Sequence, residues 1–131
     1  MKIMIIDDDA ASLKVLALLM RKYGDITTAS NGPASREIIN KSFETEEYFD
    51  LFLIDIMMPE INGHELLEEI RSNEEKIKKE NPSKIVMVSA LSDADNIMQA
   101  FENKCDAYIV KPVRKEKLVD ELAKLNIHEH L

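Results

Sequence analysis

The sequence predicts an α/β protein in which helices cover both faces of a doubly wound sheet of five parallel strands. Three observations predict this fold: five short apolar runs recur along the 131 residues, amphipathic stretches separate them, and polar residues mark the boundaries. Strands that alternate with helical patterns are typical of a parallel sheet with crossover helices. A chain of this length has the size of one domain.

The expected strands are short, and several are apolar throughout, which is typical of strands buried on both faces of a sheet. We expect them at Lys2–Ile6, Ile26–Ala29, Leu51–Ile54, Lys84–Val88 and Ala107–Val110.

Each intervening stretch carries an apolar stripe of helical period, so we expect five helices. The clearest stripes are Leu13, Leu16, Ala17 and Met20, then Leu66, Leu67 and Ile70, and finally Leu118, Leu122 and Leu125.

Capping residues stand where these helices should begin and end. Asp9 and Asp93 can cap the first and fourth helices, and Asn31-Gly32-Pro33 opens the second. Gly24 is expected to end the first helix.

Composition narrows the function. The formal charge of −8 argues against direct binding of nucleic acid and favours cations or basic protein surfaces as partners. No apolar run approaches the roughly 20 residues of a membrane-spanning helix, and the N-terminus is unlike a secretory signal, so we expect no membrane contact and a cytoplasmic location. Cys105, the single cysteine, is expected to be a buried residue without disulfide or zinc.

Other charged and polar segments are expected to be surface. Arg71–Pro82 has the composition of a solvated helix end running into a loop. His64, His128 and His130 are interpreted as solvated surface histidines. Residues 1–125 are expected to form the domain, and Asn126–Leu131 a short polar tail.

The candidate chemistry gathers where the strands end. Ligands of open parallel sheets bind beyond the carboxyl ends of the strands, near the point where strand order reverses. Two charges 4 Å apart repel by about 4 kcal/mol at an effective dielectric of 20, so clustered carboxylates need a cation, and oxygen ligands suit Mg²⁺. The polar residues at these strand ends are Asp7, Asp8 and Asp9, then Asp55, Ser89 and Lys111.

A lysine and a hydroxyl beside carboxylates add what a phosphoryl group needs. They supply a positive charge and a hydrogen-bond donor for its oxygens, and a carboxylate is a competent nucleophile once that charge is neutralised. The sequence therefore predicts phosphoryl transfer to Asp55 with Mg²⁺ as cofactor.

The same residues carry a resemblance to a known family. Over essentially its whole length the chain resembles the receiver domain of bacterial two-component response regulators. The resemblance rests on four motifs in order, since any single one occurs widely. They are residues 3–8 (IMIIDD), residues 53–63 (LIDIMMPEING), residues 88–90 (VSA) and residues 111–112 (KP).

The resemblance implies a flavodoxin-like sheet of strand order 2-1-3-4-5 and a phosphoryl group transferred to Asp55 from a histidine kinase or histidine phosphotransfer protein. The protein would not be an enzyme in the ordinary sense, although it would assist its own phosphorylation and dephosphorylation. Asp8 and Asp55 would bind Mg²⁺ directly, Asp7 mainly through water, and Met57 through its backbone carbonyl. Lys111 would pair with Asp55, across a Lys111-Pro112 bond that the family usually holds in cis.

The resemblance also implies a switch. Ser89 and Tyr108 match a pair in which the hydroxyl moves toward the phosphoryl group and the ring turns inward. The movement would reshape the face of the fourth helix, fifth strand and fifth helix for an unknown downstream protein. Met57 and Leu91 place apolar side chains beside the site, which predicts slow loss of phosphate.

Two alternatives belong to other functional classes. A haloacid-dehalogenase-type phosphatase would use Asp7 as nucleophile and Asp9 as acid, but Ala11 replaces its usual Thr or Val and Asp55 would have no role. A receiver-like module that binds partners without phosphorylation is disfavoured by the complete set of acids, lysine and hydroxyl.

Overall fold

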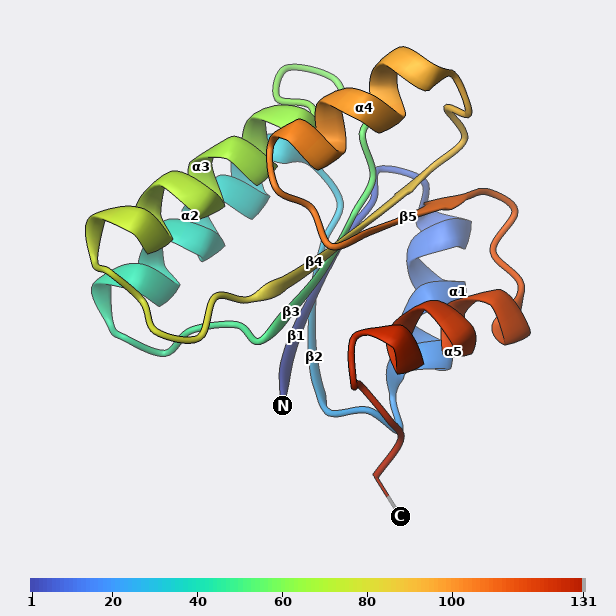
Figure 1. Ribbon diagram of the computed structural model, residues 1–131, viewed down its shortest axis with the longest axis horizontal. Coiled ribbons are helices and arrows are strands. Elements are labelled where there is room, and N and C mark those ends of the chain that lie inside the picture. Colours follow the sequence, from blue (N-terminus) through green and yellow to red (C-terminus); the bar gives the residue numbers. More distant parts are fainter. Residues whose placement is uncertain (131) are drawn as a thin grey trace.

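Five parallel strands form one sheet in the order β2-β1-β3-β4-β5 in the computed structural model, which describes residues 1–130 (Figure 1). The chain winds outward from β1 to one edge and then to the other, as the doubly wound prediction requires. The strands are β1 (Lys2–Ile6), β2 (Asp25–Ala29), β3 (Leu51–Ile54), β4 (Lys84–Ser89) and β5 (Ala107–Val110). The helices are α1 (Ala10–Met20), α2 (Gly32–Glu44), α3 (Gly63–Lys76), α4 (Ala94–Glu102) and α5 (Lys115–Lys124).

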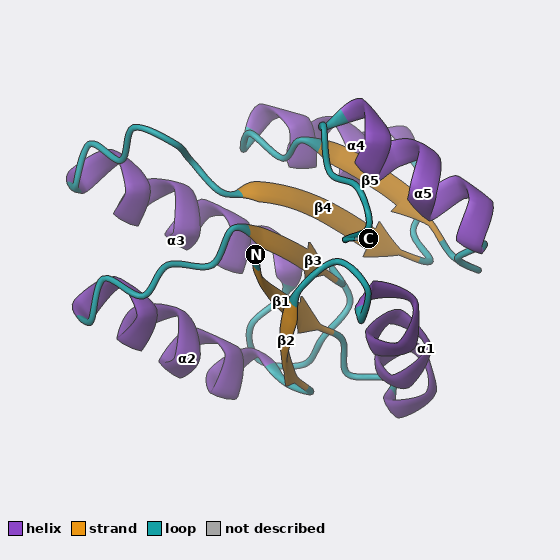
Figure 2. Ribbon diagram, turned by 90° about the horizontal axis from the view of Figure 1, so that it is seen from below, coloured by secondary structure: helices purple, strands orange, loops and turns teal. Residues whose placement is uncertain are grey.

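Two hydrophobic cores lie on the two faces of the sheet. Helices α2, α3 and α4 cover one face, and α1 and α5 cover the other (Figures 1 and 2). Neighbouring strand residues point to opposite faces, so Met4 joins the first core and Ile5 the second. Burial on both faces explains why the central strands are apolar throughout.

The predicted helix starts are confirmed. Side-chain oxygens of Asp9, Asn31 and Asp93 accept backbone N–H groups in the first turns of α1, α2 and α4. The predicted role of Gly24 is wrong, because α1 ends at Met20. Gly24 has no positive φ, and a Cβ there would collide with the carbonyl oxygen of Met1. Close packing of two backbones, rather than a helix end, requires this glycine.

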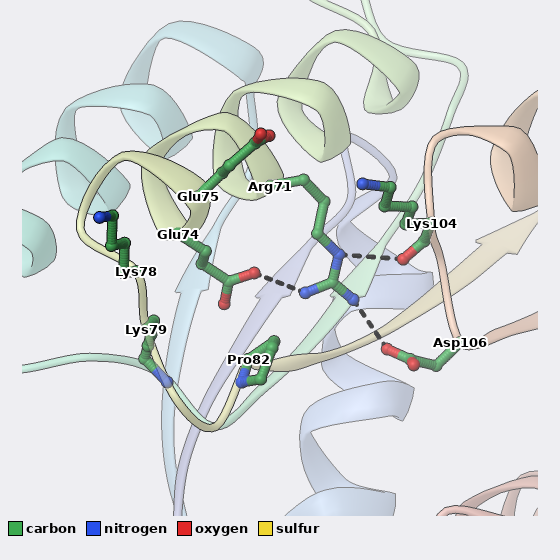
Figure 3. A pocket seen from close by; sticks show the side chains of 8 residues that line it. All are labelled: Arg71, Glu74, Glu75, Lys78, Lys79, Pro82, Lys104 and Asp106. Carbon is green, nitrogen blue, oxygen red and sulfur yellow. Dashed lines mark hydrogen bonds and ion pairs between the residues drawn. The ribbon is translucent and has the colours of Figure 1, made fainter.

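The solvated interpretation of Arg71–Pro82 is wrong for its first turn. The Arg71 side chain is 14% exposed and donates to Glu74 (2.6 Å), the Lys104 carbonyl (2.9 Å) and Asp106 (2.9 Å) (Figure 3). Its partners come from α3 and the loop before β5, up to 35 residues away. Helical periodicity cannot show such partners, because they are brought there by the fold.

The remaining surface and tail predictions have mixed outcomes. Cys105 is buried as expected, and burial raises the pKa of its thiol to about 11. His128 and His130 are exposed as expected. Within the predicted tail, Ile127 is buried in the α1 and α5 core, whereas Leu131 lies outside the described residues.

Among residues 1–130, no helix combines the length and the apolar character needed to cross a membrane.

Candidate functional site

The acidic residues meet at the carboxyl ends of β1 and β3. Ile6 and Ile54 are register partners in these neighbouring parallel strands, so Asp7 and Asp55 follow side by side. Asp8 completes the cluster, and one carboxylate oxygen from each aspartate lies within 4.8 Å of the others. Asp7 and Asp55 are buried, whereas Asp8 is exposed. The predicted convergence of these carboxylates is confirmed.

Lys111 reaches the cluster from the end of β5. Its Nζ lies 2.7 Å from Asp7 Oδ2 and 3.3 Å from Asp55 Oδ2. The contact with Asp55 was expected, but the shorter contact is with Asp7. The Lys111-Pro112 peptide bond is cis, as predicted.

Burial and neighbouring charges shift the pKa values of Asp55 and Lys111. Burial raises the pKa of Asp55, the Asp7 carboxylate raises it further, and Lys111 acts in the opposite direction. Burial lowers the pKa of Lys111, but its contacts with Asp7 and Asp55 outweigh burial and leave it raised. The site thus contains three carboxyl groups and one ammonium group.

The donor set fits a hard divalent cation. It consists of clustered carboxylate oxygens, with one exposed carboxylate open to solvent. The like charge that raises the pKa of Asp55 is the repulsion that a bound cation would relieve.

Backbone contacts hold Asp55 in place. Its N–H donates to the Ile6 carbonyl at 2.9 Å, and the Gly63 N–H donates to the Ile56 carbonyl at 2.9 Å. A Cβ at position 63 would collide with the carbonyl oxygen of Asp55. Gly63 thus lets the start of α3 pack directly against the segment that carries Asp55, a physical role that the motif alone did not reveal.

Ser89 and Tyr108 both contact the backbone of Leu91. Ser89 is fully buried, and its Oγ accepts the Leu91 N–H at 3.2 Å. The Tyr108 ring is partly buried against the core under α4, and its hydroxyl donates to the Leu91 carbonyl at 2.7 Å. The ring is therefore half-buried and tied through its hydroxyl to the loop before α4. Leu91 is half-buried and Met57 exposed, and both line the groove between the end of β3 and α4.

His64 was wrongly predicted as surface. It is 5% exposed, and its Nε2 lies 2.9 Å from Asn96 Oδ1 in α4. This contact joins the first turn of α3 to the first turn of α4, and the sequence carries no local pattern that pairs the two residues. Neither the burial of His64 nor the position of Asn96 was found from the sequence.

A doubly wound sheet with clustered carboxylates and a lysine at its switch point defines an α/β domain of phosphate-binding or metal-binding type. Residues 3–123 match the model of the response regulator receiver domain, and the chain belongs to this family. The resemblance and fold predicted from the sequence are confirmed, and the haloacid-dehalogenase-type alternative is not favoured.

Known proteins agree with this assignment. The regulatory protein VanRB of Enterococcus faecalis is 33% identical over 119 residues, which cover 91% of this chain and 49% of VanRB. A CheY-like receiver domain protein from Methanospirillum hungatei is 28% identical with a TM-score of 0.74, covering 95% of this chain and 91% of that one. The receiver domain of the Arabidopsis thaliana histidine kinase CKI1, complexed with Mg²⁺ and BeF3−, shares the fold with a TM-score of 0.82, 20% identity and coverage of 95% and 89%. The chain spans about half the length of the curated relatives it matches.

Proposed function

We propose that Asp55 is the phosphoacceptor of this receiver domain and that a histidine kinase or histidine phosphotransfer protein supplies the phosphoryl group. One observation carries the proposal: Asp7, Asp8, Asp55 and Lys111 converge at the carboxyl ends of β1, β3 and β5. In such a cluster the three carboxyl groups can bind a cation, and the cation together with the ammonium group can then balance the charge of a phosphoryl group.

In the proposed reaction a carboxylate oxygen of Asp55 attacks phosphorus in line. The new O–P bond forms as the P–N bond of the donor phosphohistidine breaks, and the released imidazole retains the bonding electron pair. Mg²⁺ would be held by Asp7, Asp8, Asp55 and the Met57 carbonyl, and it would neutralise charge on the phosphoryl oxygens. In this way the chain assists its own phosphorylation and dephosphorylation without being an enzyme for other substrates.

Lys111 and Ser89 would receive the phosphoryl oxygens. Lys111 already lies between Asp7 and Asp55 and needs only to shift its ammonium group toward the new oxygens. The Ser89 hydroxyl would exchange its contact with the Leu91 N–H for one to the phosphoryl group. Tyr108 donates a hydrogen bond to the carbonyl of the same Leu91, so a shift of Leu91 would also move the Tyr108 side chain on β5.

The proposed output is a change in protein binding at the face formed by α4, β5 and α5. Met98, Phe101 and Val110 expose apolar side chains there, at 58%, 48% and 40% of their surface. Exposed large apolar residues on one face favour a protein partner. The proposal includes an unidentified downstream protein, no direct contact with nucleic acid, and a cytoplasmic location.

Phosphorylation by acetyl phosphate tests the proposal. With Mg²⁺, the wild-type chain should gain the mass of one phosphoryl group, and Asp55→Asn or excess EDTA should prevent the gain. Unchanged wild-type mass would favour the module that binds without phosphorylation. A gain that persists in Asp55→Asn would move the acceptor to another residue.

A further inference from the structure

A chain of hydrogen bonds links the start of α3 to the start of α4. His64 Nε2 lies 2.9 Å from Asn96 Oδ1, and Asn96 Nδ2 lies 3.0 Å from both carboxylate oxygens of Asp93. Asp93 is the N-cap of α4, and its carboxylate also accepts the Asn96 N–H. The chain therefore ends on the residue that begins α4.

The direction of these bonds settles which imidazole nitrogen carries the proton. The Asn96 amide nitrogen donates to Asp93, so the amide oxygen is the atom that faces His64. His64 Nε2 must then be the donor. In the neutral ring Nδ1 is left as an acceptor, and among the described residues this buried atom has no hydrogen-bond partner.

Packing alone does not explain a histidine at position 64. An unpartnered buried polar atom costs stability, whereas a leucine would fill a similar space without one. The imidazole makes only one hydrogen bond to offset this cost. Its partner, Asn96, is half-buried and accessible to water. The histidine is therefore better explained by what its Nε2–H holds in place.

The His64 contact joins the start of α3 to the start of α4. His64 follows Gly63, whose backbone packs against Asp55, while Asn96 and Asp93 form the first turn of α4. The segment just before Asp93 contains Leu91, which is bonded to both Ser89 and Tyr108. The His64 contact and the Tyr108 contact thus hold neighbouring parts of the chain, the first turn of α4 and the loop before it.

We propose that His64 is a positioning residue that couples the Asp55 segment to α4, by holding the first turn of α4 in the arrangement in which the Tyr108 hydroxyl bonds to the Leu91 carbonyl. This inference rests on the proposed function and adds a regulatory contact to it. When only one arrangement binds a phosphoryl group well, the apparent affinity falls with the population of that arrangement. His64→Leu should therefore weaken the response of the site without weakening the fold.

The experiment titrates each variant with beryllofluoride in Mg²⁺ buffer and follows backbone amide signals by NMR. His64→Leu removes the donor, and His64→Gln supplies an amide N–H that can reach the same oxygen. Asn96→Ala removes the acceptor, and the double variant His64→Leu/Asn96→Ala tests whether the two act as one contact. Thermal unfolding and hydrogen exchange of the first α4 turn are measured on each variant without beryllofluoride.

His64→Leu should lower the apparent beryllofluoride affinity about fivefold, the effect of one net hydrogen bond, with an unfolding midpoint equal to or above wild type. It should also speed hydrogen exchange in the first turn of α4. His64→Gln should restore most of the affinity, the double variant should be no weaker than Asn96→Ala, and imidazole ¹⁵N signals should show a protonated Nε2.

Unchanged affinity and exchange in His64→Leu would overturn the coupling, as would additive losses in the double variant. A fall in affinity that parallels a fall in unfolding midpoint would assign His64 a purely structural role. Wild-type protein that fails to bind beryllofluoride would contradict the proposed function instead, and the exchange measurements would still decide whether His64 holds α4.

Discussion

Two charged clusters lie at opposite ends of the strands of the same sheet and differ in whether every carboxylate has an ion-pair partner. At the amino ends of the strands, Arg71 faces Glu74 and Asp106 (Figure 3). Their carboxylates also accept the N–H groups of Ser83 (2.7 Å) and Ile85 (2.8 Å). This Arg71 cluster satisfies its groups within the chain. It is a structural contact that ties α3 to the loop before β5.

At the carboxyl ends of the strands, one ammonium group lies among three carboxyl groups. Lys111 bridges Asp7 and Asp55, while Asp8 faces solvent without an ion pair among residues 1–130. Like charge and burial raise the pKa of Asp55. The comparison teaches that a charged cluster indicates function when one of its carboxylates is left without an ion-pair partner, and stability when every carboxylate is both ion-paired and hydrogen-bonded.

Removing Arg71 should have the largest effect. Arg71→Met leaves the buried Glu74 carboxylate and the half-buried Asp106 carboxylate without their cation, which should lower the free energy of unfolding by about 3–5 kcal/mol. Urea unfolding measures the change. The matched control is Arg36→Met, whose ion pair with Glu69 is 40% and 36% exposed and should matter by at most about 1 kcal/mol. Equal losses in the two variants would contradict the contrast.

Mg²⁺ should stabilise the protein by binding at the carboxyl ends of the strands. At a free concentration ten times its Kd, binding should raise the free energy of unfolding by about 1.4 kcal/mol. Asp8→Asn should reduce this gain, and Arg36→Met should leave it intact. Thermal unfolding across a Mg²⁺ titration gives the measurement, and a gain that survives Asp8→Asn would argue against the carboxylate cluster as the metal site.

Neutralising Asp55 should stabilise the fold in the absence of Mg²⁺. Because the folded pKa of Asp55 is raised, its stabilising contribution is present below the unfolded pKa and is lost as pH rises through the folded pKa. Asp55→Asn should therefore raise stability at neutral pH by about 1 kcal/mol, the size of an ordinary single-residue effect. The difference should shrink in acid, and an opposite trend in pH-dependent denaturation would count against the excess of negative charge.

The smallest expected effect concerns phosphate lifetime. The apolar side chains of Met57 and Leu91 flank the site, so phosphorylated protein should lose phosphate slowly in Mg²⁺ buffer. Met57→Asn should shorten the lifetime roughly threefold, or about 0.6 kcal/mol in the barrier, by offering water a polar neighbour. Met98→Asn, on the exposed face of α4, is the control. Rapid decay in wild-type protein would contradict the prediction.

The sequence by itself determined the secondary-structure elements and which charged residues stand at the strand ends. Apolar periods are local, so they predict the strands and helices, and residues such as Asp7, Asp55 and Lys111 stand directly at strand ends. Parallel strands bring those ends to one edge, which is why the cluster was predictable without coordinates. Asp9 and Asp93 were predictable as caps because a cap is read from its own neighbours in sequence.

Only the tertiary structure decided which charges meet and which polar groups are buried. Lys111 lies closer to Asp7 than to Asp55, Arg71 finds Asp106 across 35 residues, and His64 is buried against Asn96. Each of these pairs joins elements that are adjacent only after the sheet has formed. A residue's own sequence neighbours give its period and its cap, but its long-range partner depends on how the helices pack on the sheet.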